Sequence, residues 1–147
     1  MAQGAFSTKV SAWVAETKAR RDRVHRESAK RVIQVMQRTR SEGGNLRFDT
    51  GFLRASLVVT LGDALPAMTF KPDGVERFSY DGAATNLVIA GADIKDPITA
   101  VYTANYARPR EYGAKGQMAD RFVALAAQQW QQIVNQVCAE AQKRAGG

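Results

Sequence analysis

The sequence predicts an α+β domain, in which a small, mostly antiparallel sheet is packed by a long N-terminal helix and a C-terminal helix. Three observations predict this class. Residues 7–40 contain neither Pro nor Gly, β-branched stretches occupy the middle of the chain, and apolar positions recur at helical spacing over residues 118–143. With 147 residues, 45% of them hydrophobic, the chain can form one core, so we expect a single domain over residues 1–147.

The first predicted element is a helix over residues 7–40. Its apolar and small residues recur at steps of three and four, Ser7 or Thr8 can cap its start, and residues 41–44 (Ser-Glu-Gly-Gly) supply a stop. Such a helix is about 50 Å long, which exceeds an ordinary globular helix. We therefore expect part of it to project from the domain or to lie along a neighbouring subunit.

Residues 45–116 are predicted to hold the sheet and its loops. Short β-branched runs predict three strands, at residues 55–61, 85–90 and 98–103. Residues 67–71 and 75–80 favour a short hairpin around Pro72-Asp73-Gly74. On the last strand, alternation places Ile98, Ala100 and Tyr102 on one face. The connections are too short for helical crossovers, which favours antiparallel pairing.

The last predicted element is a helix over residues 118–143, with an apolar stripe and a Gln-rich opposite side. A polar but nearly uncharged surface of this kind favours contact with another protein. Trp13 and Trp130 lie on the stripes of the two helices, so we expect them in the core and packed against each other. Cys138 is expected to be a buried, inert thiol.

The positive charge of the chain is concentrated in one helical segment. The formal net charge is +7, and residues 18–40 alone hold nine basic residues against two acidic ones. Seven of the nine are Arg, whose planar fork suits bidentate contacts with carboxylates or phosphates. The candidates for such contacts are Arg20, Arg21, Arg23, Arg26, Lys30 and Arg31.

Two interpretations of this basic helix remain open: a contact with nucleic acid, or a solvated or inter-subunit helix whose arginines pair with acidic neighbours. We favour the second, because the segment lacks the interleaved aromatic residues of single-strand binders and the surroundings of a recognition helix. His25 is expected at the surface.

The composition argues against an enzyme. One His and one Cys leave no cluster with metal-ligand spacing, and no nucleotide-binding or nucleophile motif is present. We therefore expect no catalytic residue, no cofactor and no metal. The chain has neither the apolar start of a secretory signal nor a membrane-spanning window, so we expect synthesis in the cytosol and no membrane partner.

Two short motifs and one helix start follow each other along the chain. D-T-G-F-L-R-A-S at residues 49–56 precedes a predicted strand, Y-A at residues 106–107 leads to E-Y-G at residues 111–113, and R-F-V at residues 121–123 opens the last helix. In order and spacing these resemble the tail-completion (neck) protein family of long-tailed bacteriophages. The chain departs from that pattern at Arg108-Pro109-Arg110 and in residues 62–84, which look like an insertion.

The resemblance implies a structural virion protein without chemistry of its own. Copies would form a sixfold ring at the head–tail junction, after assembly in the host cytoplasm. The ring would cap the tail tube and dock it onto the head connector, so the implied partners are the tail-tube protein and a stopper or adaptor protein. DNA would pass through the lumen without sequence-specific binding. A terminator of the tail tube and a joining protein one layer higher both remain open.

The motif residues are the candidates for subunit and partner contacts. They are Asp49, Thr50, Gly51, Leu53, Arg54, Ser56, Tyr106, Arg108, Arg110, Glu111, Tyr112 and Gly113. The residues alone allow a plainer interpretation, a turn at strand entry for the first motif and a structural turn with a buried tyrosine for the second. For Glu111 the interface interpretation pairs it with Arg54 or a basic-helix Arg of a neighbour.

The alternative function is a small basic DNA-binding or packaging-accessory protein that uses residues 18–40. It predicts steeply salt-dependent binding of duplex DNA by the monomer.

Overall fold

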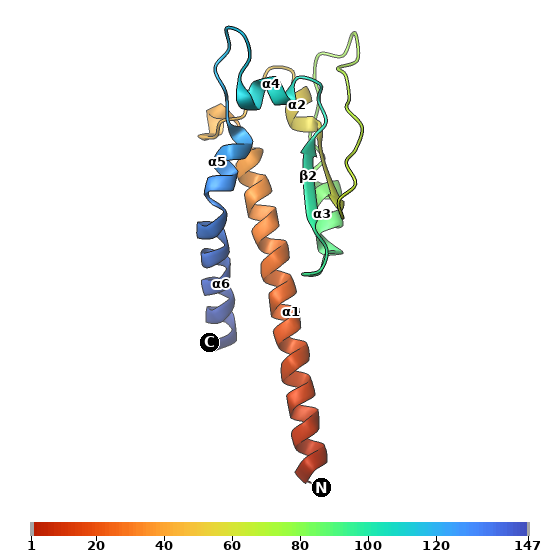
Figure 1. Cartoon of the computed structure of the whole chain (residues 1–147), viewed down its shortest axis with the longest axis vertical. Helices are drawn as coiled ribbons and strands as arrows, with labels where there is room; N and C mark the ends of the chain where they lie inside the picture. Colours follow the sequence, from red (N-terminus) through yellow and green to blue (C-terminus); the bar gives the residue numbers. More distant parts are fainter. Residues whose placement is uncertain (1, 147) are drawn as a thin grey trace.

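A computed structural model describes residues 2–146, and it confirms the α+β class. The elements of this part of the chain are α1 (Ala2–Met36), the 3-10 helix η1 (Arg40–Glu42), α2 (Phe52–Ala55), β1 (Leu57–Leu61), α3 (Gly82–Ala90), β2 (Ile98–Tyr102), α4 (Ala107–Tyr112), α5 (Phe122–Gln128) and α6 (Trp130–Gly146). In Figure 1, α1 lies between two groups of elements, with α5 and α6 on one side and the sheet with α3 on the other. α6 runs back along α1 in the opposite direction.

The long N-terminal helix is confirmed, although it starts earlier than predicted and ends at Met36 instead of residue 40. The helix ends because the chain turns back on itself over residues 38–46. Arg40 N donates to Leu46 O (3.0 Å), and Leu46 N donates to Arg38 O (3.3 Å). A Cβ on Gly44 would lie 2.0 Å from Arg38 O, so only glycine fits there. Gly43 and Gly44 therefore allow this turn.

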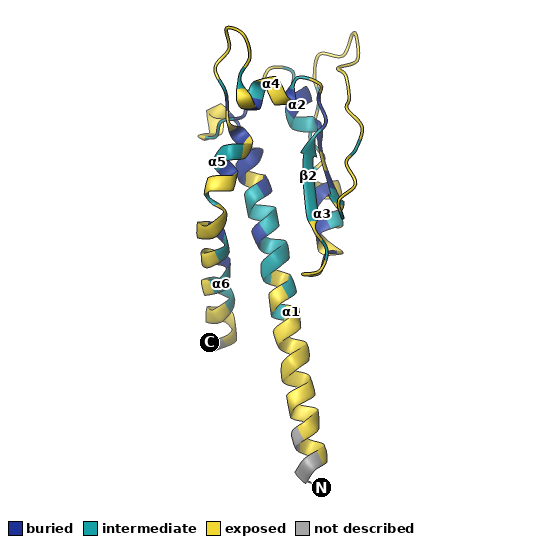
Figure 2. Cartoon of the chain, in the orientation of Figure 1, coloured by how far each residue is buried: buried dark blue, intermediate teal, exposed yellow. Residues whose placement is uncertain are grey.

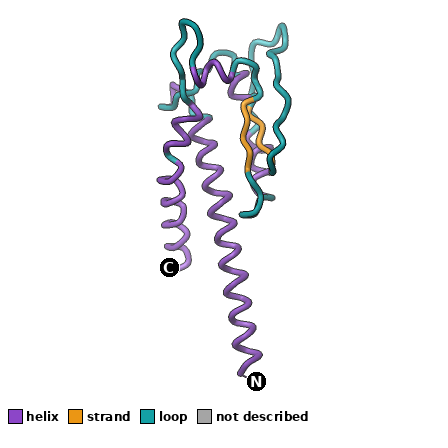
Figure 3. The backbone as a smooth tube through the Cα atoms, in the orientation of Figure 1, coloured by secondary structure: helices purple, strands orange, loops and turns teal. Residues whose placement is uncertain are grey.

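The described residues contain two strands instead of the three to five that the sequence predicted (Figure 3). β1 and β2 pair antiparallel, with Leu57 opposite Tyr102 and Val59 opposite Ala100. Leu57 and Val59 are buried, and Val58 between them is exposed. As predicted, Ile98, Ala100 and Tyr102 share one face of β2, and all three pack against buried residues of the core.

The predicted strand at residues 85–90 is wrong, since this segment belongs to α3. The side chain of Asp81 caps the helix by accepting from Ala83 N (3.1 Å) and Ala84 N (3.3 Å). Thr85 and Ile89, four residues apart, are buried on one side of α3. Cap and packing together outweigh the β propensity of this apolar run.

The predicted hairpin at residues 67–80 is also absent, because its backbone groups bond elsewhere. Thr69 N donates to Thr103 O (2.7 Å), and Asn105 N donates to Thr69 O (2.9 Å). Further on, Phe78 N donates to Thr50 O (2.9 Å). Residues 62–81 therefore form a long loop that is held against the ends of β2 and α2 instead of against itself.

The C-terminal helix begins at Phe122, not at residue 118, and is divided into α5 and α6 at Gln129. Asp120 N donates to Arg110 O (2.7 Å), which holds the chain out of a helix until residue 121. At the break, Gln129 N bonds to Ala126 O (3.0 Å), one residue short of the helical spacing.

Buried side chains form two hydrophobic clusters. The larger joins α1, β1, α3, α5 and α6 and includes Ile33, Leu57 and Ile89. The smaller lies between α2, α4 and the start of α5, around Leu46, Phe52 and Phe122. Tyr102 packs against both clusters, so β2 connects them.

Candidate assembly interfaces

The first motif forms the sharp turn that starts α2. Gly51 has φ +85°, and a Cβ there would lie 2.6 Å from Phe78 O. Thr50 Oγ1 accepts from Phe52 N (3.3 Å), and Leu53 is buried in the smaller cluster. The turn interpretation of these residues is therefore confirmed, while the exposed Asp49 remains free to meet a partner.

Arg54 and Ser56, from the same motif, fasten α2 to its neighbours. Arg54 Nε donates to Gln37 O (3.1 Å), and Gln37 Nε2 donates back to Arg54 O (2.9 Å). The Arg54 guanidinium also lies 5.6 Å from the ring centre of Tyr80. Buried Ser56 accepts at its carbonyl oxygen from Thr103 N (3.0 Å). Both residues thus have roles inside the chain.

The second motif forms α4, which the sequence had left irregular, and it reverses one expectation. Tyr112 is 76% exposed, with the Arg108 guanidinium 6.0 Å from its ring centre, whereas Glu111 is buried. The plainer interpretation of this motif, a structural turn with a buried tyrosine, is therefore wrong about the tyrosine. Gly113 has φ +87° and ends the helix. Arg108, Arg110 and Tyr112 are the members of this motif that a partner can reach.

Glu111 acts within the chain, as a cap for α5. Its Oε2 accepts from Val123 N and its Oε1 from Ala124 N, both at 2.9 Å. A carboxylate at a helix N-terminus is favoured by both hydrogen bonding and the helix dipole. The residue that precedes α5, Arg121, has a φ of +54°, which is unusual for a residue other than glycine.

The two motifs, about fifty residues apart in the chain, meet in space. The ring centres of Phe52 and Tyr106 are 5.9 Å apart, and a pocket of about 360 Å³ lies between α2 and α4. Partial burial raises the pKa of Tyr106. The pocket is lined by Arg47, Asp49, Thr50, Gly51, Leu53, Lys71, Tyr106, Pro109, Arg110 and Gln117. The structure thus brings most of the predicted interface residues to one end of the molecule.

Asp120 is a structural residue that the sequence did not single out. Its buried Oδ1 accepts from Arg40 (2.8 Å) and Arg47 (2.9 Å), so it links the turn that follows α1 to the start of α5. No partner of its Oδ2 lies among the described residues. No spacing rule could have found this pair of contacts, because they join residues more than seventy positions apart.

The basic helix is partly neutralised by contacts within the chain. Arg31 forms a bidentate pair with Glu140 of α6 (3.1 and 2.5 Å) and also bonds Glu27 (3.0 Å). Arg20 pairs with Glu16 at 2.6 Å, and Arg21 lies 3.9 Å from Asp22. Arg20, Arg21 and Arg31 thus meet acidic residues of their own chain.

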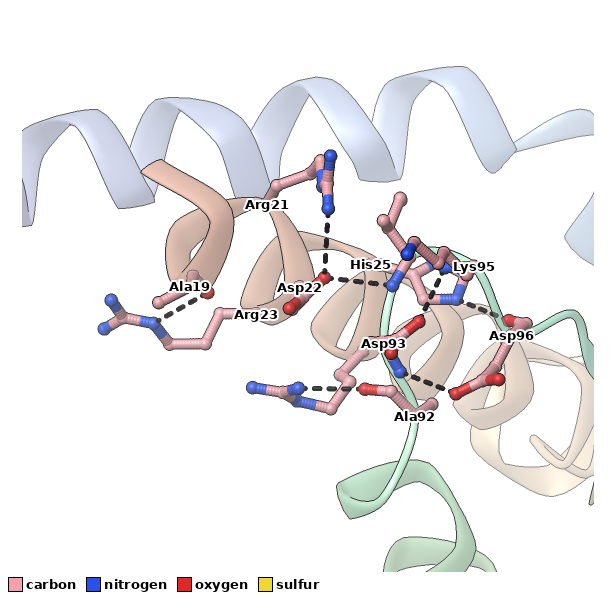
Figure 4. A network of polar contacts seen from close by, with 11 residues as sticks. Ala19, Arg21, Asp22, Arg23, His25, Ala92, Asp93, Lys95 and Asp96 are labelled. Carbon is pink, nitrogen blue, oxygen red and sulfur yellow. Dashed lines mark hydrogen bonds and ion pairs between the residues drawn. The ribbon is translucent and has the colours of Figure 1, made fainter. Parts of the chain in front are cut away.

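A polar network joins the basic helix to the turn before β2 (Figure 4). Asp22 Oδ1 accepts from Ile94 N (2.9 Å), and His25 Nε2 lies 3.1 Å from Asp96 O. Arg26 donates to Ala92 O (2.9 Å). His25 is therefore half-buried and engaged, not a free surface residue as expected.

Five cations of residues 18–40 meet no carboxylate in the part of the chain that the structure describes. They are Lys18, Arg23, Arg26, Lys30 and Arg38. Three of these, together with Arg20 and Arg144, line a groove of about 420 Å³ between α1, α3 and the end of α6. Its apolar lining comes from Val24, Ile89 and Val137, among others. We call this site the basic groove.

The first turns of α1 project beyond the rest of the molecule (Figure 2). Every side chain of residues 7–19, which we call the free half of α1, is exposed. Val10, Trp13 and Val14 lie on one side of it, and Trp13 is 64% exposed. The prediction that Trp13 and Trp130 pack against each other in the core is wrong, because Trp130 is exposed as well. Cys138 is only half-buried.

Within residues 2–146, no group of three or more His, Cys, Asp or Glu side chains is arranged to hold a metal ion. Nor does any described helix combine the length and apolar character of a membrane span. No family model, curated protein or solved structure matches the chain.

Proposed function

We propose that the chain is a structural virion protein whose copies form a ring at the head–tail junction of a long-tailed bacteriophage, where the ring completes the tail tube and joins it to the head connector. The observation that carries the assembly role is the free half of α1. Val10, Trp13 and Val14 are exposed on one side of a helix that extends away from the core. Exposed apolar side chains at such spacing are typical of a helix that packs on another protein.

The phage context rests on the two motifs, whose exposed members gather at the opposite end of the molecule. Asp49 and Arg110 line the pocket between α2 and α4, and Tyr112 is exposed close by. Tyr and Arg are enriched at interface centres. A ring protein that joins two different layers needs separate surfaces at its two ends, and this arrangement supplies them.

Electron microscopy of lysates tests the proposal. A phage that lacks this chain should yield DNA-filled heads beside unattached tails, and overlong tails would assign the terminator layer. Trp13→Ser should give the same separated particles, while Lys9→Ser, an exposed change on the same helix, should leave particles joined. Normal joined particles without the chain would overturn the proposal.

The DNA-binding alternative is favoured by the five cations of residues 18–40 that meet no carboxylate among the described residues. Such a site would bind duplex DNA with an affinity that falls steeply with salt, by a log–log slope of about −0.9 per phosphate neutralised. Replacing Arg23, Lys30 and Arg38 by Gln should then reduce that slope by about 3. A weak, shallow salt dependence for the wild-type monomer would exclude this alternative.

A further inference from the structure

We infer that the basic groove binds residues 62–81 of a second copy of this chain, which we call the long loop. The inference deepens the ring proposal and rests on it for self-association, since it names the contact between neighbouring subunits. The groove and the loop are complementary in charge and in apolar content, and they lie apart on one molecule.

The long loop carries apolar side chains that the chain itself does not cover. Leu65 is 74% exposed, Met68 63% and Phe70 69%. The loop has no regular structure apart from one bridge at Thr69, so these side chains are not the outer face of a helix or strand. Such a concentration on one segment indicates a contact surface.

The charges favour the long loop over the free half of α1 as the occupant of the groove. Among the groove-lining residues are five cations and two glutamates, so the groove is positive. The long loop has four acidic residues against Lys71 and Arg77, so it is negative. The free half of α1 has two lysines and one glutamate, and this positive segment would be repelled by the groove.

The groove has an apolar floor and charged walls that suit such a loop. Val24, Ile89 and Val137 come from three different helices, and Arg23 and Lys30 stand beside them on α1. Neither of these two cations pairs with a carboxylate in the described chain, so both are available. Asp73 and Glu76, near the tip of the loop, are exposed and are their partners.

The contact must join two molecules, because the loop cannot reach the groove of its own chain. Hydrogen bonds at Thr69 and Phe78 hold the loop against β2 and α2. In Figure 1 its tip lies at the end of the molecule opposite the C-terminus of α6, which borders the groove. A contact between two different surfaces of identical subunits is heterologous, and repeated it closes a ring or builds a filament.

A charge swap followed by sedimentation velocity tests the contact. Arg23→Glu with Lys30→Glu should weaken self-association at least about tenfold, and so should Asp73→Lys with Glu76→Lys. Combining all four changes should restore association to within about threefold of wild type. The control, Lys9→Glu with Lys18→Glu, changes the charge of the same helix equally but outside the groove, and should leave association within about threefold.

A second measurement does not depend on charge. In a Cys138→Ser background, a mixture of Val75→Cys and Asn86→Cys chains should form a disulfide-linked heterodimer on mild oxidation, whereas Val75→Cys mixed with Ser7→Cys should not. If neither the charge-swap rescue nor this crosslink is observed in a chain that still forms oligomers, the groove–loop contact is overturned, but the ring proposal is not. A chain that stays monomeric, both alone and in the particle, would overturn the groove–loop contact and the ring proposal together.

Discussion

Among single residues, Glu111 connects two parts of the fold that the sequence keeps separate. It belongs to α4, and its two carboxylate oxygens accept the N–H groups that start α5. Because the side chain is buried, water cannot replace these bonds when the carboxylate is altered.

The change Glu111→Gln should therefore lower the free energy of unfolding by about 1–3 kcal/mol, since the amide keeps one acceptor but loses the charge. In urea unfolding, the same change at exposed Glu42 should cost less than about 0.5 kcal/mol. Equal midpoints for the two variants would show that Glu111 does not stabilise the fold.

Among the elements, α1 and α6 are joined across their polar sides by the Arg31–Glu140 pair. The bidentate contact with Arg31 holds the pKa of Glu140 below its ordinary value of 4.5. A carboxyl group whose pKa is lower in the folded state stabilises the fold above its unfolded pKa, and this contribution is lost as the pH falls through the folded pKa.

Wild type should therefore exceed Glu140→Gln in stability at neutral pH, and the difference should disappear in acid, below the usual Glu range. Urea unfolding of both chains at about pH 7 and about pH 3 measures this difference in the free energy of unfolding. A difference that persists unchanged at the lower pH would mean that the pair does not act through the Glu140 charge.

As a whole, the molecule consists of a packed core and one projecting helix. Tyr102 contacts both hydrophobic clusters, and its hydroxyl donates to Gln37 Oε1 (2.7 Å), so the core is continuous. Every side chain of residues 7–19 is exposed, so the core covers none of them. An isolated helical segment of this length is marginally stable in water.

Hydrogen exchange of the dilute monomer should therefore be fast over residues 7–19 and slow over residues 28–36, although both belong to α1. In the assembled particle the first segment should become protected. Slow exchange of both segments in the monomer would show that the free half of α1 is stable without a partner.

The sequence by itself determined the elements whose signals are local and repeated. The Pro-free run predicted α1, and alternation predicted that Ile98, Ala100 and Tyr102 share one face of β2. It also predicted the turn at Gly51, because a left-handed backbone favours glycine.

Tertiary structure decided everything that depends on distant partners. The run at residues 85–90 is helical because Ile89 packs in the core, which adds to the local cap that Asp81 supplies. Glu111 and Asp120 bind groups that no spacing rule connects to them. The exposure of Trp13 was likewise undecidable from periodicity, since a pattern shows which side of a helix is apolar but not whether the same chain has anything to cover it.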